Sequence, residues 1–168
     1  MAENKRIIVL PMDGSYHSEY AFEWYNDQIR RENDYVIIAA CFDRHTYGIY
    51  AYGTADASEL ATQMQRDIDD HTKQIDAFKE KLTKAGLQGE VVQSAGKAGE
   101  CAVKVAHEKN AAMIVCGARG HGTVRRTIMG SNSEYIMHHS DIPVVICRHK
   151  PHQNPTMLFL FGEQWSII

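Results

Sequence analysis

The chain contains five short apolar runs that are separated by longer segments of helical character. The runs lie at 6–10, 35–42, 90–94, 112–116 and 143–147. Most of them are nearly continuous rather than alternating with polar residues, which is typical of strands buried on both faces of a parallel sheet. The run at 90–94 is shorter and more polar, so we expect it to form an edge strand.

Between these runs, apolar residues recur at spacings of three and four, which is the period of one face of a helix. The longest such pattern precedes the third run and carries charged residues on its other face. Gly86 follows it and suits a C-terminal cap. The residues expected to face inward are Leu60, Met64, Ile68, His71, Ile75, Phe78 and Leu82.

Three further helices are expected. The first would start at a cap formed by Ser15 or Ser18 and run to about residue 31, and another would occupy about 99–109. The last would begin at Ser131, where the sequence Ser-Asn-Ser-Glu matches a capping box, in which a serine and a glutamate satisfy each other's backbone donors.

Strands and helices therefore alternate along the whole chain. Right-handed crossovers between parallel strands place helices on both faces of the sheet. We therefore predict an α/β fold, with a single doubly wound domain of five parallel strands and four helices over 1–148. The segment 43–57 is predicted to be a surface loop. The tail at 149–168 holds the apolar run Met157–Phe161 outside the strand pattern, and its role is not assigned.

Composition narrows the class of protein. The apolar content is 44%, the charged content is 23% and the net charge is −3, so no general nucleic-acid binding is expected. No apolar run is long enough to cross a bilayer, and the first residues lack the core of a signal peptide. The four cysteines are far apart and form no C-x-x-C pair, so we expect buried thiols rather than disulfides. A cytoplasmic location without a membrane partner follows.

The densest candidate chemistry lies at 117–131, between the fourth run and the last helix, and reads GARGHGTVRRTIMGS. Glycines at the end of a strand let backbone N–H groups approach a ligand, and a helix N-terminus suits phosphate. Arg119, Arg125 and Arg126 add guanidinium groups. In α/β sheets ligands bind at the carboxyl ends of strands, where the turn Pro11–Ser15 should also open. The simplest ligand for this set is a nucleotide phosphate.

These residues resemble the ATP-binding signature of the universal stress protein family. Gly117, Gly120, Gly130 and Ser131 occupy its pattern of G-x-x-G, nine residues, then G-S, and the resemblance covers roughly 5–148. It implies a Rossmann-like, adenine-nucleotide-binding domain with strand order 3-2-1-4-5.

The resemblance also implies an assembly and roles for individual residues. Members of the family usually form homodimers through the last strand, here Val144–Cys147. Gly117 and Gly120 would approach the ribose and phosphates, while Gly130 and Ser131 would hold phosphate oxygens at the start of the helix. If Gly117 and Gly130 line the pocket, valine at either position should block nucleotide without unfolding the sheet.

Two further positions complete the implied site. Pro11 would border the adenine, and Cys41 would lie near the base. Asp13 would face the ribose or a bound Mg²⁺, although a turn-forming role is compatible with its position. The candidate nucleotide-binding residues are Pro11, Asp13, Ser15, Cys41, Gly117, Arg119, Gly120, Gly130, Ser131 and Asn132.

Catalysis has less support in the sequence. The phosphate-binding lysine motif G-x-x-x-x-G-K-[ST] is missing from the chain, and no residue stands out that could position water for ATP hydrolysis. The leading hypothesis is a homodimeric, nucleotide-responsive regulator that binds ATP, with Mg²⁺ as the accompanying metal. A scaffold module with an empty pocket, a slow ATPase and, more distantly, a flavin-binding protein remain as alternatives.

Overall fold

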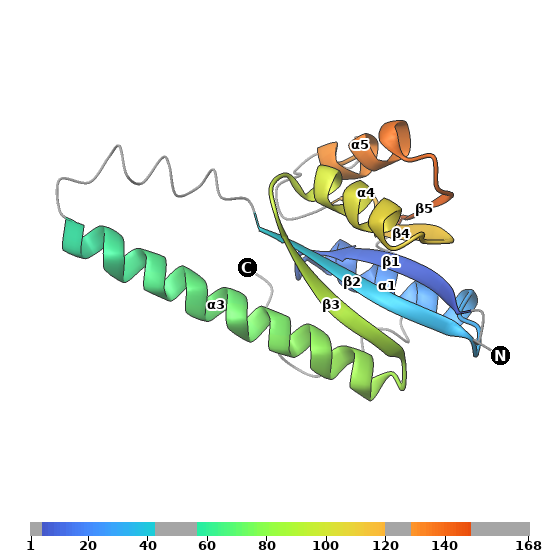
Figure 1. Cartoon of the computed structure of the whole chain (residues 1–168), viewed down its shortest axis with the longest axis horizontal. Coiled ribbons are helices and arrows are strands. Elements are labelled where there is room, and N and C mark those ends of the chain that lie inside the picture. The colour runs from blue at the N-terminus through green and yellow to red at the C-terminus, as the bar shows by residue number, and fades with distance from the viewer. Residues whose placement is uncertain (1–4, 43–56, 120–128, 149–168) are drawn as a thin grey trace.

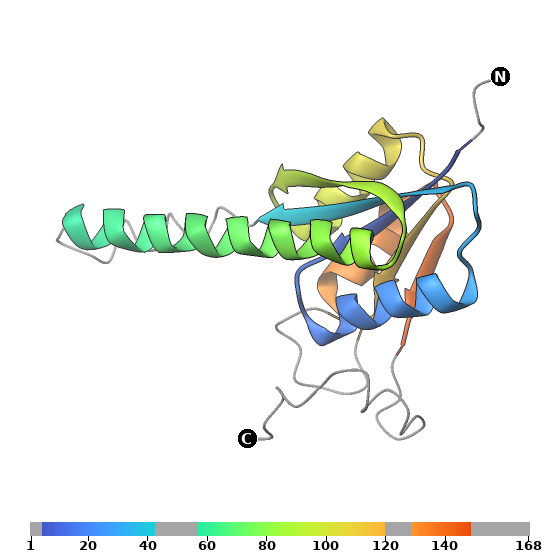
Figure 2. The ribbon, with the colours of Figure 1, turned by 90° about the horizontal axis from the view of Figure 1, so that it is seen from below.

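The structure is a computed structural model that describes residues 5–42, 57–119 and 129–148. These residues form a parallel sheet covered by helices on both faces (Figures 1 and 2). In chain order the elements are β1 (Arg6–Met12), α1 (Tyr16–Gln28), β2 (Asp34–Phe42), α3 (Ala57–Lys84), β3 (Gln88–Ala95), α4 (Ala98–Glu108), β4 (Met113–Gly117), α5 (Ser131–His139) and β5 (Val144–Cys147). The tail at 149–168 and the predicted loop up to residue 56 lie outside the described residues.

The sheet has five strands in the order β3-β2-β1-β4-β5, and every pairing is parallel. The predicted α/β class, strand order and four helices are therefore confirmed for the described part of the chain. β3 lies at an edge, as its polar sequence predicts. β1 is central, between β2 and β4, so the turns that follow β1 and β4 open beside each other.

Two apolar cores lie on opposite faces of the sheet. Along β1, Ile8 and Leu10 face the core formed with α1 and α3, whereas Val9 faces the core formed with α4 and α5. Successive side chains of a strand point to opposite faces, so a strand covered on both sides needs apolar residues at consecutive positions. This arrangement explains the continuous apolar runs in the sequence.

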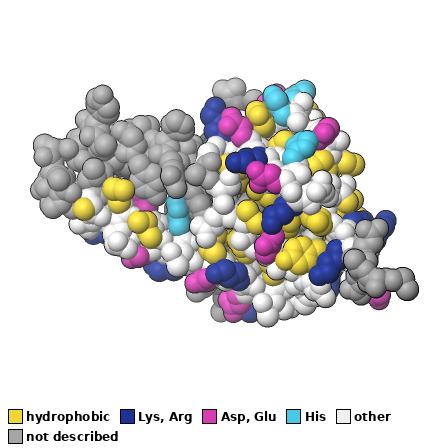
Figure 3. Space-filling model, in the orientation of Figure 1, with side chains coloured by type: hydrophobic (Ala, Val, Ile, Leu, Met, Phe, Trp, Pro, Cys, Tyr) yellow, Lys and Arg dark blue, Asp and Glu magenta, His cyan; other side chains and the backbone are white. Residues whose placement is uncertain are grey.

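The predicted inward face of the longest helix is correct only for its C-terminal half. Ile75, Phe78 and Leu82 are buried, whereas Met64 and Ile68 are 43% and 51% exposed. With 28 residues, α3 is about 42 Å long, but the nine residues of β2 extend only about 30 Å. The N-terminal half therefore projects beyond the sheet, with hydrophobic side chains at its surface (Figures 1 and 3).

The helix starts agree in part with the prediction. Ser15 caps α1, and its Oγ accepts a hydrogen bond from the Ser18 N–H at 3.3 Å. The predicted capping box of the last helix is wrong, because the N-cap of α5 is Gly130 and no side chain caps that terminus. Ser131 is already the first helical residue, so it and Glu134 are one position too far along for the reciprocal pair.

In the ranges that the structure describes, no helix combines the length and apolar character needed to cross a bilayer.

Candidate functional site

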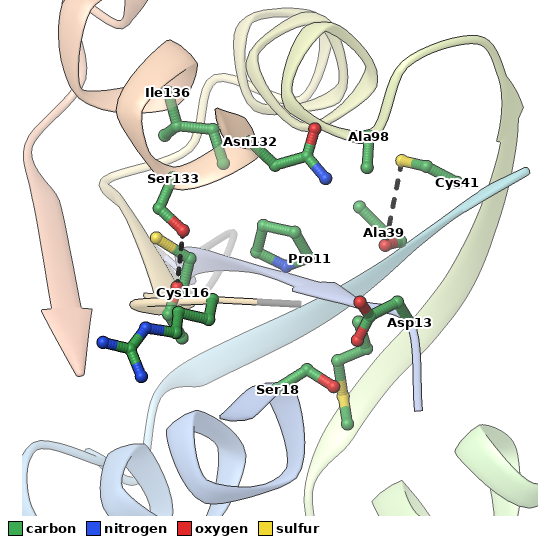
Figure 4. Close-up of a pocket in the computed structure, with 13 residues that line it drawn as sticks. Pro11, Asp13, Ser18, Ala39, Cys41, Ala98, Cys116, Asn132, Ser133 and Ile136 are labelled. Atoms are coloured by element: carbon green, nitrogen blue, oxygen red, sulfur yellow. Dashed lines mark hydrogen bonds between the residues drawn. The ribbon is translucent and has the colours of Figure 1, made fainter. Parts of the chain in front are cut away.

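A hollow opens at the carboxyl ends of β1 and β4 (Figure 4). The strand order reverses here, because β1 leads to α1 on one face and β4 leads to α5 on the other. The empty space between its walls is about 430 Å³, including space open to solvent. The lining residues are Pro11, Met12, Asp13, Ser18, Ala39, Cys41, Ala98, Cys116, Gly117, Arg119, Asn132, Ser133 and Ile136.

Most of the residues predicted from the sequence meet in this hollow. They come from the ends of β1, β2 and β4 and from the start of α5. Segments that are far apart in the sequence therefore converge at one end of the sheet. The predicted residues that line the hollow are Pro11, Asp13, Cys41, Gly117, Arg119 and Asn132.

Among the described residues, Ser15, Gly130 and Ser131 were also predicted but are not part of this lining. Ser15 is buried as the cap of α1 and does not line the hollow, and Ser131 is exposed at the start of α5. Gly130 is buried, and its N–H donates to the Ala118 carbonyl at 2.9 Å. Gly120, Arg125 and Arg126 are outside the described residues.

One wall of the hollow is formed by small or apolar side chains. Pro11 and Ala39 are register partners on adjacent strands, and Ala98 begins α4 above them. Ile136 closes the side formed by α5. Small side chains at 39 and 98 leave space above the sheet where a larger residue would fill it, which suits a flat apolar group.

Several lining residues were not among the sequence candidates: Met12, Ser18, Ala39, Ala98, Cys116, Ser133 and Ile136. The alanine pair inside the second apolar run is a local signal, since small residues interrupt a run of bulky ones. The others resemble ordinary core residues until the strand register and helix positions bring them to one place.

Asp13 forms the acidic part of the hollow. Its Oδ1 accepts a hydrogen bond from the Ser15 N–H at 2.9 Å, which is the turn-forming contact expected of such an aspartate. The same carboxylate points toward the hollow (Figure 4). Turn formation and access to a ligand are therefore compatible at this residue.

Two helix N-termini meet at the opposite side. The Gly99 N–H of α4 donates to Asn132 Oδ1 of α5 at 3.3 Å, and a Cβ on Gly99 would lie only 3.0 Å from the Asn132 carbonyl oxygen. The Asn132 side chain thus caps the first turn of α4, whereas the N-cap of α5, Gly130, provides no side-chain cap. The positive ends of both helix dipoles therefore favour an anion here.

The contact with Gly99 also orients the Asn132 amide. Because Oδ1 faces the Gly99 N–H, the Nδ2 group is directed into the hollow (Figure 4). Asn132 can thus present hydrogen-bond donors to a ligand. At the base of the same helix, Ser133 Oγ donates to the Gly117 carbonyl at 2.7 Å, which ties the start of α5 to the end of β4.

The cysteines of the hollow are neutral groups. Burial raises the pKa of the Cys41 thiol and raises the pKa of Cys116 to about 12. Both thiols are therefore protonated near neutral pH and are poor nucleophiles. All four cysteines are free; Cys101, Cys116 and Cys147 are buried as predicted, whereas Cys41 is half-buried.

Comparisons with known proteins identify the family. The sequence model of the Universal stress protein family matches residues 5–148. A putative universal stress protein of Staphylococcus saprophyticus is 28% identical over 143 residues, which cover 84% of this chain and 82% of that protein.

Two solved structures of the family share the fold. A universal stress protein family protein of Arabidopsis thaliana with AMP bound has a TM-score of 0.62 and 13% identity, covering 90% of this chain and 96% of that one. A universal stress protein in complex with cAMP has a TM-score of 0.54 and 22% identity, covering 87% and 98%. Because the family model matches residues 5–148, the chain belongs to the universal stress protein family.

Proposed function

We propose that this protein binds an adenine nucleotide in the hollow at the carboxyl ends of β1 and β4, and that it acts as a nucleotide-responsive regulator. The observation that carries the proposal is the pairing, in one hollow, of a small-residue apolar wall with the N-termini of two helices. The apolar wall suits a purine base, and the helix N-termini suit phosphate. The AMP and cAMP complexes of two structural neighbours support the same class of ligand.

The base and ribose would occupy the side of the hollow nearest β1 and β2. Pro11 and Ala39 offer an apolar floor for the adenine, with Cys41 at its edge. Asp13, at the end of β1, is placed to accept hydrogen bonds from ribose hydroxyl groups. This assignment gives each part of a nucleoside a chemically matched partner.

The phosphates would lie toward β4 and α5. Gly117 and Arg119 line this side, and Gly130 and Ser131 begin the helix whose N-terminus faces it. The backbone N–H groups of the first turn and the dipole of α5 favour phosphate oxygens, and Asn132 Nδ2 adds a donor. Gly120 is included in the proposal by its place in the family signature.

We further propose ATP with Mg²⁺ as the ligand form. Among the described residues, no group of three or more histidine, cysteine, aspartate or glutamate side chains could hold a metal. Mg²⁺ often binds through one carboxylate together with substrate phosphates and water. Asp13 fits that pattern as the one acidic residue of the described lining, and the metal would supply charge neutralisation of the phosphates.

A homodimer through β5 is part of the proposal. Among the described strands, β5 (Val144–Cys147) pairs with β4 alone and forms an edge of the sheet. The other side of such a strand offers backbone N–H and C=O groups for pairing with a second copy. Sedimentation analysis of the full chain tests this point: a concentration-independent monomer would contradict it.

The proposed ligand is tested by calorimetric titration of the full chain, after its preparation has been checked for co-purified nucleotide. Mg·ATP, AMP and cAMP should be compared with Mg·GTP. Saturable binding of an adenine nucleotide and much weaker binding of GTP is the expected result. A folded, nucleotide-free protein that binds none of them would contradict the proposal and favour a scaffold with an empty pocket.

A further inference from the structure

A side chain of α3 contacts the turn that carries Asp13. Gln74 is half-buried on this helix, and its Nε2 donates a hydrogen bond to the Asp13 carbonyl oxygen at 2.8 Å. The two residues are 61 positions apart in the sequence. The contact therefore joins the long helix directly to the rim of the hollow.

The turn is shaped to accept this contact. Gly14 has φ of +75°, a conformation that favours glycine, and a Cβ there would lie 2.6 Å from Gln74 Nε2. On its other side the turn is fixed by the bond from the Ser15 N–H to Asp13 Oδ1 at 2.9 Å. Asp13 is thus held through its carbonyl by α3 and through its carboxylate by the start of α1.

The fold does not depend on the Gln74 bond to keep α3 in place. The next residue, Ile75, is buried in the core together with Phe78 and Leu82. Between Phe78 and Leu82, Lys81 Nζ lies 2.8 Å from carboxylate oxygens of both Glu19 and Glu23 on α1. Removing one half-buried amide should therefore leave the helix docked.

We propose that Gln74 is a positioning residue for the nucleotide site. By holding the Asp13 carbonyl, it fixes the direction in which the Asp13 carboxylate enters the hollow. This inference rests on the proposed function, because it assigns the residue an effect on nucleotide affinity. It also makes α3 the element through which a change outside the hollow reaches the ligand.

The first test is Gln74→Met in the full chain, which keeps the length of the side chain but removes the donor. We expect the Kd for AMP to rise about three- to tenfold, the equivalent of one typical hydrogen bond. Exchange of the Ser15 amide hydrogen, followed by NMR, should accelerate by a similar factor, because the turn loses one of its two anchors. A merely structural role would lower the melting temperature and leave both readouts unchanged.

A matched control lies on the same helix. Gln65→Met removes an exposed glutamine that bonds to Asp69 and is remote from the turn. It should change neither the AMP affinity nor the Ser15 exchange. Gln74→Glu is the second variant: it replaces the donor with a carboxylate facing a carbonyl oxygen, so it should weaken AMP binding more than Gln74→Met does.

The outcomes separate this inference from the proposed function. Unchanged affinity and unchanged Ser15 exchange in both Gln74 variants would overturn the inference. A loss of affinity with unchanged Ser15 exchange would also overturn it, since Gln74 would then act on the ligand without positioning the turn. If the wild-type protein binds no adenine nucleotide, the proposed function fails, and unchanged Ser15 exchange would then overturn the positioning of the turn as well.

Discussion

Gly117, at the end of β4, lies directly against the main chain of His17 in α1. A Cβ built on Gly117 would overlap the His17 carbonyl group and would lie 3.0 Å from the His17 Cβ. The glycine is thus required where a helix approaches a strand closely, in addition to lining the hollow. This contact changes the expectation that valine at 117 would block nucleotide and leave the fold intact.

Gly117→Ala should therefore lower the stability of the protein. The new methyl group meets main-chain atoms that cannot move aside without shifting α1, and overpacking of this kind costs about 1–3 kcal/mol. Denaturant unfolding of the variant and the wild type measures the difference in the free energy of unfolding.

Gly130→Ala is the comparison for this prediction. Its Cβ would lie 3.1 Å from the Arg119 Cα, a milder contact than the overlap that a Cβ on Gly117 would make with the His17 main chain. We expect a smaller loss of stability than for Gly117→Ala. Equal stabilities of Gly117→Ala and the wild type would contradict the packing role.

The two halves of α3 provide a matched pair of substitutions. Ile75 is only 4% exposed and lies in the core, whereas Ile68 is 51% exposed on the projecting half. Ile75→Ala should cost about 2–5 kcal/mol, because it leaves a cavity. Ile68→Ala should change the free energy of unfolding by less than about 0.5 kcal/mol. Similar losses for both variants would indicate that the projecting half is covered in solution.

The sequence predicts the sheet well because the strands bury both faces. Continuous apolar runs such as 35–42 and 112–116 identify central parallel strands regardless of their neighbours. The apolar periodicity of α3 is equally clear, but it does not indicate where the sheet beneath the helix ends. Met64 and Ile68 therefore have the same pattern as Ile75 and a different environment.

The candidate site is predictable only in part. Glycines and Asp13 are visible because turns and strand ends need particular residues. Ala39, Ala98 and Ile136 become lining residues only through strand register and helix placement, which the local sequence does not encode. α5 begins at Ser131 as predicted, but its N-cap is Gly130 rather than Ser131, because glycine and serine both serve as N-caps and the chain uses the glycine.

Asn132→Asp tests the donor that faces the hollow. The aspartate can still accept the Gly99 N–H, but it replaces the Nδ2 donor by a negatively charged oxygen near the proposed phosphates. We expect AMP affinity to fall at least tenfold, about 1.4 kcal/mol. Stability should be maintained, because a negative charge in the first turn of α5 suits the helix dipole. Calorimetry and thermal unfolding give the two readouts.

Asn26→Asp is the matched control for Asn132→Asp. Asn26 accepts a hydrogen bond from Arg30 on the exposed face of α1, and it does not line the hollow. The same change of charge there should leave AMP affinity unaltered. An Asn132→Asp protein with wild-type affinity would remove Asn132 from the proposed site.

At the other end of the sheet, Asp34 predicts a specific dependence of stability on pH. Burial alone would raise the pKa of its carboxyl, but hydrogen bonds from Arg6, the Tyr25 hydroxyl and the Arg31 N–H lower the pKa below its usual value. Two contacts from Arg6 measure 2.6 and 2.7 Å, and the contact from Tyr25 measures 2.7 Å. The carboxylate side chain has no exposed surface.

Asp34→Asn should therefore lower the free energy of unfolding by about 3 kcal/mol at neutral pH, because it leaves Arg6 without its buried partner. A carboxyl whose pKa is depressed by folding stabilises the native state above its unfolded pKa, about 3.9, and this contribution is lost as the pH falls through the lower folded pKa. The difference in the free energy of unfolding between variant and wild type should stay constant from pH 7 to about pH 4 and should then decrease. Denaturant unfolding across this range measures it.

The control for this pH series is Asp76→Asn. Asp76 pairs with Lys79 at 2.9 Å on the surface of α3, where both side chains are more than half exposed. An exposed pair of this kind contributes little to stability, so the free energies of unfolding of Asp76→Asn and the wild type should differ by less than about 0.5 kcal/mol at every pH. If the loss of stability in Asp34→Asn stayed the same in strong acid, it would arise from packing rather than from charge. The buried carboxylate would then not be what joins β1, β2 and α1 at the amino end of the sheet.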